Sequence, residues 1–261
     1  MILDEIVAKT RERMIEVEKQ VSLEEIKKAA LSMEINQEFP FEKALRQNEI
    51  QFICEVKKAS PSKGLIAPDF PYVQIAKDYE NAGAAAISVL TEPYYFQGSN
   101  EYLKEIAANV TIPIIRKDFT VNEYMIYEAK AIGASAILLI CSVLSREELI
   151  RFKEIADSLG LSCLVETHDE EEVKTALEIG ARIIGVNNRN LKDFTVDIQN
   201  SIRLRQLIPQ DIIFVSESGM KTTEDILRLR ENQTDAVLIG ETLMRSENKK
   251  EMLNTLRGKS L

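Results

Sequence analysis

The stretch Glu178-Ile-Gly-Ala-Arg-Ile-Ile-Gly-Val-Asn-Asn-Arg189 contains one transition that recurs along this chain. An amphipathic segment ends there, Gly180 follows, a short apolar run comes next, and polar residues close the run. Glycine after a helix adopts the left-handed backbone conformation that ends it. Short continuous runs of Ile, Leu and Val are typical of parallel strands buried on both faces. The stretch therefore predicts the end of a helix, a turn and a buried strand in succession.

The same transition recurs along the whole chain. Gly83, Gly133 and Gly160 also end amphipathic segments directly before apolar runs. Successive runs are spaced by roughly 25 to 30 residues, which is the length of one strand and one helix. The apolar runs are Phe52 to Val56, Ala85 to Leu90, Ile112 to Ile115, Ala136 to Cys141, Ser162 to Val165, Ile183 to Val186, Ile212 to Val215 and Ala236 to Ile239.

This repetition predicts an α/β protein built as a single (β/α)8 barrel, or TIM barrel. The chain length of 261 residues agrees with the ~250 residues that are typical of that fold. An open doubly wound sheet is the alternative architecture. That fold usually carries a G-x-G-x-x-G turn after its first strand, and this sequence has no such turn.

Residues 1–48 precede the first apolar run and are predicted to form an N-terminal helical extension, while the barrel spans residues 49–261. Ser22 and Glu25 have the spacing of a capping box at the start of a helix. An earlier amphipathic helix is predicted by the spacing of Leu3, Ile6, Val7, Thr10, Met14 and Val17. Because no Gly/Ser/Pro-rich linker separates extension and barrel, we predict a single domain over residues 1–261.

Charge and cysteine content disfavour several classes of protein. With 33 basic and 42 acidic residues the net charge is −9, which disfavours a nucleic-acid partner, because binding phosphate backbones needs an excess of Lys and Arg. The first residues carry charges and no apolar segment of signal or anchor type, so we expect a cytoplasmic protein without a membrane partner. Cys54, Cys141 and Cys163 are expected to be reduced core thiols. His168, the single histidine, is interpreted as a helix-start residue, and no metal site is expected.

Polar residues close several of the apolar runs. The closing segments are Glu55-Val-Lys57, Arg116-Lys117-Asp118, Glu166, Asn187-Asn188-Arg189 and Glu217-Ser218-Gly219. Catalytic residues of (β/α)8 enzymes lie at the carboxyl ends of strands, and alternate residues such as Glu55 and Lys57 share a strand face. Such charges are either ion pairs at the barrel mouth or a site for an anionic small molecule. Because burying each ion costs on the order of several kcal/mol, so many polar strand ends together favour the site.

Glycines after the last two runs favour phosphate as the anion. Gly219 and Gly240 follow the seventh and eighth runs, where backbone N–H groups of many barrels bind phosphate. A tight turn is the alternative for either glycine alone.

The segment Ser60-Pro-Ser-Lys-Gly64 is interpreted as a lid or a solvated turn. The aromatic residues of Thr91-Glu-Pro-Tyr-Tyr-Phe-Gln-Gly98 either pack under their loop or hold a planar ring.

Together these segments resemble the indole-3-glycerol phosphate synthase family of tryptophan biosynthesis. The likeness runs from about Phe41 to Met244 and extends loosely through the N-terminal helices. The motifs that carry it are Glu55-Val-Lys-Lys-Ala-Ser-Pro-Ser-Lys-Gly64, Leu90-Thr-Glu-Pro-Tyr-Tyr-Phe-Gln-Gly98, Arg116-Lys-Asp-Phe119, Val186-Asn-Asn-Arg-Asn-Leu191, Ser216-Glu-Ser-Gly219 and Ile239-Gly-Glu-Thr-Leu-Met244. The resemblance implies a carboxy-lyase that closes the ring of 1-(2-carboxyphenylamino)-1-deoxyribulose 5-phosphate with loss of carbon dioxide and water. It implies no cofactor and a phosphorylated small molecule as partner, and we expect a monomer or weak oligomer.

The resemblance also implies roles for individual residues. Lys117 is expected to be the general acid that protonates the ketone oxygen, and Glu166 the base of the later dehydration, with a pKa raised by burial. Lys57 matches a second essential lysine that contacts substrate anions or donates a proton. The other residues implied in catalysis or orientation are Glu55, Asn187, Arg189 and Ser218. The implied substrate-binding residues are Ser60, Phe96, Leu138, Leu191, Glu217, Gly219, Ile239, Gly240 and Glu241.

One position departs from the pattern of the family. Glu241 stands where some relatives have a small hydroxyl residue that donates to phosphate. Because a carboxylate repels a phosphate dianion, we expect Glu241 to offer its backbone N–H and to turn its side chain away.

Other functions stay open at this point. A Schiff-base aldolase would use Lys117 as a nucleophile. Phosphoribosylanthranilate isomerase shares the fold but would use a cysteine and an aspartate, which Cys54 and Glu55 do not present well. A barrel that only binds phosphate would leave Lys57, Lys117 and Glu166 unexplained as a set.

Overall fold

The computed structural model describes residues 2–190 and 193–259, and within them eight parallel strands close into a barrel. The strands neighbour one another in chain order and are β1 (Gln51–Val56), β4 (Ala86–Leu90), β5 (Ile114–Lys117), β6 (Ala136–Ile140), β7 (Ser162–Thr167), β8 (Ile183–Asn187), β9 (Ile213–Glu217) and β10 (Ala236–Ile239). A short antiparallel hairpin of β2 (Ala59–Ser60) and β3 (Gly64–Leu65) lies in the loop after β1. The predicted (β/α)8 barrel is therefore confirmed.

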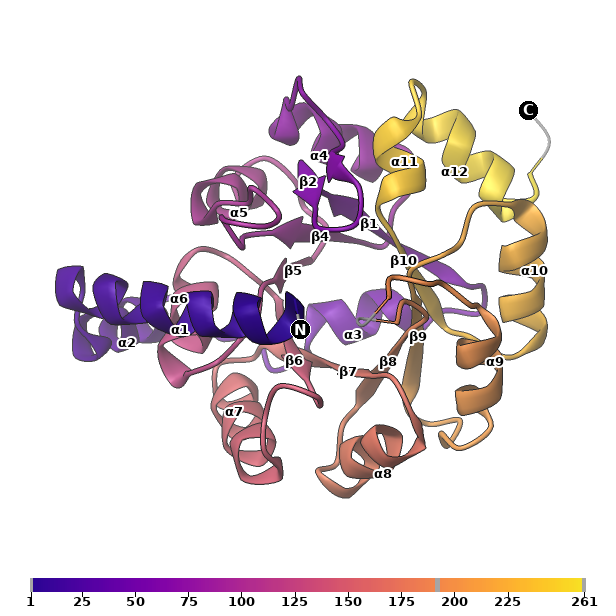
Figure 1. Ribbon diagram of the computed structural model, residues 1–261. Coiled ribbons are helices and arrows are strands. Elements are labelled where there is room, and N and C mark those ends of the chain that lie inside the picture. Colours follow the sequence, from indigo (N-terminus) through magenta and orange to yellow (C-terminus); the bar gives the residue numbers. More distant parts are fainter. Residues whose placement is uncertain (1, 191–192, 260–261) are drawn as a thin grey trace.

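Helices surround this barrel in a ring, as Figure 1 shows. They are α4 (Tyr72–Asn81), α5 (Asn100–Ala107), α6 (Glu123–Ala131), α7 (Arg146–Ser158), α8 (Glu170–Glu178), α9 (Gln199–Arg205), α10 (Thr223–Glu231), α11 (Glu241–Arg245) and α12 (Lys249–Arg257). The glycines Gly83, Gly133, Gly160 and Gly180 follow helix ends with φ between 68° and 95°. As predicted, they adopt the left-handed conformation that ends a helix before the next strand.

The inner face of the barrel changes from apolar to charged along the strands. Ile53, Ile115 and Leu164 belong to the apolar cluster inside the barrel and are fully buried. Alternate residues of a strand point to the same face, so the residue two positions after each of these also points into the barrel. These positions hold Glu55, Lys117 and Glu166. The barrel is therefore packed at its amino end and charged at its carboxyl end.

The third predicted strand begins and ends later than expected. The apolar run Ile112 to Ile115 predicted the strand, but β5 spans Ile114–Lys117. Pro113 has no N–H to donate to the strand ladder, so regular pairing starts after it. The strands β7, β8 and β9 also continue through the polar residues at their ends. Several residues expected just after strands are thus held within them.

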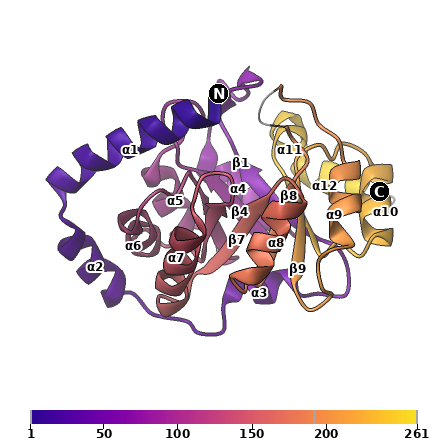
Figure 2. The same ribbon diagram turned by 60° about the horizontal axis from the view of Figure 1, so that its bottom comes forward.

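The residues before β1 form α1 (Ile2–Gln20), α2 (Leu23–Ser32) and α3 (Pro40–Leu45). Ser22 and Glu25 form the predicted capping box at the start of α2, and α2 packs on α6. Figure 2 shows α1 and α3 at opposite ends of the barrel. Phe41 and Leu45 of α3 join the inner cluster, and the buried face of α1 carries Leu3, Ile6, Thr10 and Met14. We propose that extension and barrel form one domain, because they share this packing.

No helix in the described ranges has the length and apolar character needed to cross a membrane.

Candidate active site

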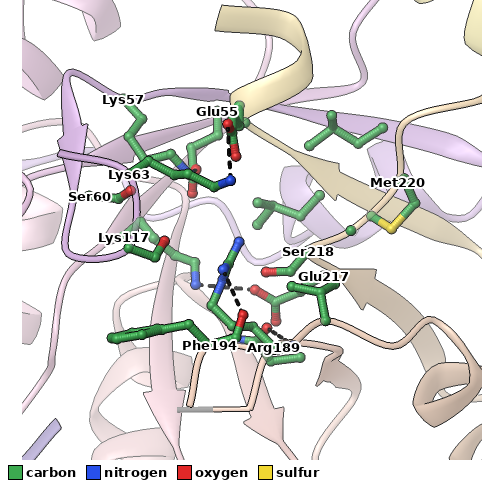
Figure 3. Close-up of a pocket in the computed structure, with 18 of the residues that line it drawn as sticks. Glu55, Lys57, Ser60, Lys63, Lys117, Arg189, Phe194, Glu217, Ser218 and Met220 are labelled. Carbon is green, nitrogen blue, oxygen red and sulfur yellow. Dashed lines mark hydrogen bonds and ion pairs between the residues drawn. The ribbon is translucent and has the colours of Figure 1, made fainter. Parts of the chain in front are cut away.

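A cavity of about 570 Å³ lies at the carboxyl ends of the barrel strands, and Figure 3 shows a close-up of its lining. Its size suits a small-molecule ligand. Every predicted site residue in the described part of the chain lines it: Glu55, Lys57, Ser60, Phe96, Lys117, Leu138, Glu166, Asn187, Arg189, Glu217, Ser218, Gly219, Ile239, Gly240 and Glu241. Leu191, the remaining predicted residue, lies outside the described residues. The structure places these fifteen described residues around the cavity, while the role of each residue stays a prediction.

Lys117 lies at the centre of the charged cluster. It is the last residue of β5, and its Nζ lies 3.1 Å from Oε2 of Glu166 on β7 and 3.1 Å from Oε2 of Glu217 on β9. Figure 3 shows Lys117 and Glu217 pointing toward each other across the pocket. Burial alone lowers the pKa of Lys117, but the charges of Glu217, Glu166 and Glu55 outweigh burial and raise it above its ordinary value. Lys117 is therefore a charged ammonium group that can donate a proton.

The two carboxyl groups beside Lys117 have opposite pKa shifts. Burial and the nearby charge of Glu166 raise the pKa of Glu217 to about 7, although Lys117 opposes the rise. Burial also acts to raise the pKa of Glu166, but Lys117 and His168 overcome this effect and lower it below the ordinary value. The expectation that the pKa of Glu166 is raised is therefore wrong, because Lys117 and His168 lie against this carboxylate and outweigh its burial.

Two glycines make room for this charged cluster. A Cβ atom on Gly185 of β8 would overlap the carboxylate of Glu217, and one on Gly240 would overlap the carboxylate of Glu55 and Nζ of Lys57. Lys57 and Glu55 form a hydrogen-bonded ion pair, which confirms that the two side chains lie on the same side of β1. Gly240 therefore accommodates this pair, in addition to its predicted closeness to phosphate.

The loop after β9 has an unusual backbone. Ser218 and Gly219 both have positive φ values, 67° and 98°, and a Cβ atom on Gly219 would overlap Val196. Buried Asn188 fixes this loop, because its Nδ2 donates to the carbonyl of Ser218 at 3.0 Å. Backbone N–H groups after the last strands of a (β/α)8 barrel commonly bind phosphate.

Glu241 is held by cations at the rim of the cavity. Its Oε1 accepts a hydrogen bond from Nε of Arg245 at 3.1 Å and lies 3.8 Å from Nζ of Lys63. Lys63 belongs to the predicted lid segment, between β2 and β3. The carboxylate is therefore partly neutralised, and it connects α11 to the loop after β1.

The apolar side of the cavity is built on the loop after β4. Glu92 is completely buried, and its carboxylate accepts hydrogen bonds from the backbone N–H groups of Tyr94, Tyr95 and Phe96. This network holds Phe96 beside Phe119, with 6.2 Å between the ring centroids. Leu138 and the residues Ile2, Leu3 and Ile6 of α1 also line the cavity. One side of the cavity therefore has an apolar wall beside the charged cluster, which suits a flat group.

Arg189 reaches into the middle of the pocket, between Lys117 and Ser218 (Figure 3). Its Nη1 donates to the carbonyl of Phe194 at 3.4 Å, and its backbone N–H donates to Oδ1 of Asn187 at 3.0 Å. Among the described residues no carboxylate lies within ion-pair distance of its guanidinium. This arrangement leaves a planar fork of donors facing the cavity, which suits a carboxylate ligand.

Several residues near the site were not identified from the sequence. His168, interpreted as a helix-start residue, lies beside Glu166, with 3.4 Å between Nε2 and Oε1. Glu92 and the α1 residues were not connected with the cavity. The only signals that pointed to them were the position of His168 two residues after Glu166 and the position of Glu92 inside a quoted motif.

The described residues contain no group of His, Cys, Asp and Glu side chains arranged to hold a metal ion. Cys54, Cys141 and Cys163 are free thiols, as expected from their spacing. Burial raises the pKa of Cys54 to about 12, so this thiol is neutral at physiological pH.

Solved structures share the fold of this chain at low sequence identity. A KGPDC structure from Streptococcus mutans matches with a TM-score of 0.63 and 10% identity, covering 81% of this chain and 97% of that chain. A tryptophan synthase complex from Pyrococcus furiosus matches with a TM-score of 0.59 and 14% identity, covering 80% and 98%. These matches support the barrel fold alone.

Sequence comparison is more specific. The family model of indole-3-glycerol phosphate synthase matches residues 3–256. A relative with this name from Ruminiclostridium cellulolyticum is 58% identical over 258 residues, covering 99% of both chains. Another from Endomicrobium trichonymphae is 56% identical over 257 residues, covering 98% of this chain and 100% of the relative. With full-length matches at this identity, this chain belongs to the indole-3-glycerol phosphate synthase family.

Proposed function

We propose that this protein converts 1-(2-carboxyphenylamino)-1-deoxyribulose 5-phosphate into indole-3-glycerol phosphate, with release of carbon dioxide and water. The observation that carries the proposal is Lys117, held between Glu166 and Glu217 inside a cavity of a family member. A fully protonated amine beside two carboxylates with different pKa values suits a reaction that needs both proton donation and proton removal.

The three parts of this substrate fit three parts of the cavity. Its planar ring suits the wall formed by Phe96 and Leu138. Its carboxylate suits the guanidinium of Arg189, since a planar fork of donors binds a carboxylate in a bidentate manner. Its phosphate suits the backbone of Gly219 and Gly240, which lies after the last two barrel strands, where phosphate commonly binds.

Lys117 acts as the general acid in the ring-closing step. The ring carbon that bears the carboxylate attacks the ketone carbon, and the ketone oxygen takes a proton from Lys117 and becomes a hydroxyl. The carboxylate then leaves as carbon dioxide, and its bonding electrons restore the aromatic ring. The raised pKa of Lys117 supports this role, because the amine is fully protonated before the substrate binds.

Glu166 acts as the base of the dehydration. The new hydroxyl leaves as water with a proton from the ammonium group of Lys57, while Glu166 removes a proton from the neighbouring carbon. The lowered pKa of Glu166 supports this role, because the carboxylate is ionised at the start. Glu55 and Lys57 provide a second acid and base pair beside the first.

The alternative functions fit the site less well. A Schiff-base aldolase needs a neutral lysine amine as nucleophile, and the carboxylates around Lys117 stabilise the charged form. An isomerase that uses a cysteine needs a reactive thiol, but Cys54 is fully buried and its pKa is raised to about 12.

The proposal includes the binding partner, the cellular compartment and the oligomeric state of the protein. The partner is this small phosphorylated molecule and not a nucleic acid, which the net charge of −9 supports. Free cysteines suit the reducing cytoplasm. We propose that the protein works there as a monomer or weak oligomer.

The test replaces Lys117 with Ala. We expect kcat to fall by about 10²- to 10⁴-fold, the usual contribution of a general acid, while inhibition by inorganic phosphate stays within about threefold, because the phosphate end is untouched. Equal losses of turnover and phosphate binding would show that Lys117 binds substrate instead. Borohydride treatment of the parent with a ketose phosphate should leave Lys117 unmodified, and a covalent adduct there would favour the aldolase.

A further inference from the structure

The imidazole of His168 lies between two carboxylates. Its Nε2 is 3.4 Å from Oε1 of Glu166 at the end of β7, and its Nδ1 is 3.1 Å from Oε2 of Glu172 on α8. The same oxygen of Glu172 accepts the backbone N–H of His168 at 2.7 Å. Both ring nitrogens therefore face an anion, and Glu172 fixes the position and the plane of the ring.

Glu166 consequently has one basic side chain at each of its oxygens. Lys117 contacts Oε2 from the cavity side, and His168 approaches Oε1 from the side of α8. Once Lys117 has transferred its proton to the substrate, it is neutral and no longer offsets the charge of Glu166. His168 is then the cation that still lies against this carboxylate, at the stage when Glu166 must act as a base.

The groups that surround His168 favour its charged form. Carboxylates face it from three elements, namely Glu166 on β7, Glu172 on α8 and Glu217 on β9. Lys117 on β5 lies beyond Glu166. Next to α8, the thiol of Cys141 donates to the backbone carbonyl of Glu172. From α9, Asn200 donates to the carbonyl of His168 at 3.0 Å.

We propose that His168 is a positioning residue that acts through Glu166: its imidazolium ring, held by Glu172 at 3.4 Å from Glu166, keeps Glu166 ionised after Lys117 has given up its proton. The inference rests on the proposed function, because it assumes that Glu166 is the base. Burial on its own lowers the pKa of His168, whereas the hydrogen bond with Glu172 and the charges of Glu166 and Glu217 outweigh burial and raise it above 6.5.

The charge coupling can be measured without turnover, because His168 is the single histidine of the chain. NMR titration of its ring should give a pKa above 6.5 in the parent, and a lower pKa in Glu166→Gln and Glu172→Gln variants. Glu171→Gln is the matched control, because it removes the same charge from the exposed face of α8. A ring pKa at or below 6.5 in the parent, or one that Glu166→Gln leaves unchanged, would overturn the proposal.

A kinetic arm tests the consequence for catalysis. In His168→Gln we expect kcat to fall about tenfold with KM nearly unchanged, and the acid limb of the kcat profile to move up by about one pH unit, because Glu166 loses a nearby positive charge. A purely structural role would alter kcat and KM together and leave the limb in place.

The outcomes separate this inference from the proposed function. An active parent whose His168→Gln variant keeps its kcat and its acid limb overturns the role of His168 alone. A parent that forms no indole product overturns the proposed function and this role together. If His168→Gln does not fold, the pH profile of Glu172→Gln serves instead, since a less basic His168 should shift the acid limb in the same direction.

Discussion

Glu217 is the buried carboxyl group whose ionisation this fold disfavours most clearly. Its pKa is raised from 4.5 to about 7 by burial and by the charge of Glu166, against the opposing effect of Lys117. The difference of about 2.5 pH units corresponds to about 3 kcal/mol of folding free energy, at about 1.36 kcal/mol per unit. Because the folded state has the higher pKa, this stability is present below pH 4.5 and is lost as the pH rises through about 7.

Replacing Glu217 with Gln keeps the shape of the side chain but removes its titration. We expect the free energy of unfolding of the variant minus that of the parent to rise by about 2 to 3 kcal/mol from about pH 5 to about pH 8, as measured by urea unfolding at each pH. Turnover should fall in the same variant, because Lys117 loses one of its two neighbouring carboxylates. A stability difference that is the same at both pH values would refute the reasoning, since it would mean that Glu217 titrates normally in the folded protein.

Further predictions concern the rim and the N-terminal extension. Replacing Glu241 with Ser should lower the KM for the phosphorylated substrate by about three- to tenfold with little change in kcat, because a carboxylate near the proposed phosphate site is removed and Lys63 is released. Steady-state kinetics check this, and an unchanged or higher KM contradicts it. Arg13→Gln should cost about 1 to 3 kcal/mol in urea unfolding, because the buried carboxylate of Asp118 loses the closer of its two guanidinium partners, at 3.0 Å, and keeps Arg116 at 3.5 Å. The exposed neighbour Arg11→Gln is the control, and equal effects of the two variants would count against this ion pair.

The barrel was predictable because its strands are buried on both faces. Apolar runs such as Ala136 to Cys141 stand out against the helices on either side. Strand ends were less predictable, because the inner face of the barrel becomes polar where the strands still continue. Lys117 lies within β5 and Glu217 within β9, so the hydrophobic pattern ends before the strand does.

The alternation of side chains along a strand predicted that charged residues converge at the barrel mouth, but it did not predict which carboxylates pair with Lys117. Glu55 lies in β1 and Lys57 follows the last residue of that strand, so their spacing of two residues places them on the same side. Which carboxylates meet Lys117 depends on how β5, β7 and β9 are aligned around the closed barrel, and on Gly185, which leaves room for Glu217. This register is a property of the folded ring and leaves no local pattern in the sequence.

Supporting residues were the hardest to recognise. Nothing in the sequence distinguishes Glu92 from its neighbours in the motif, yet its buried carboxylate orders the backbone before Phe96. His168 looked like an ordinary residue at the start of a helix, and its contact with Glu166 became visible only in three dimensions. Single polar side chains of this kind have no periodicity, so their function depends on partners that folding brings together.

The central claim is that the cavity around Lys117 closes an indole ring. Because the chain contains no tryptophan, the protein adds no indole fluorescence of its own, and emission in the indole band, at shorter wavelength than that of the aminobenzoate substrate, reports the product. When purified protein receives 1-(2-carboxyphenylamino)-1-deoxyribulose 5-phosphate, we predict that indole fluorescence and carbon dioxide appear in equal amounts and that both are lost in the Lys117→Ala variant. Carbon dioxide without indole, or no signal from the intact parent, would contradict the account.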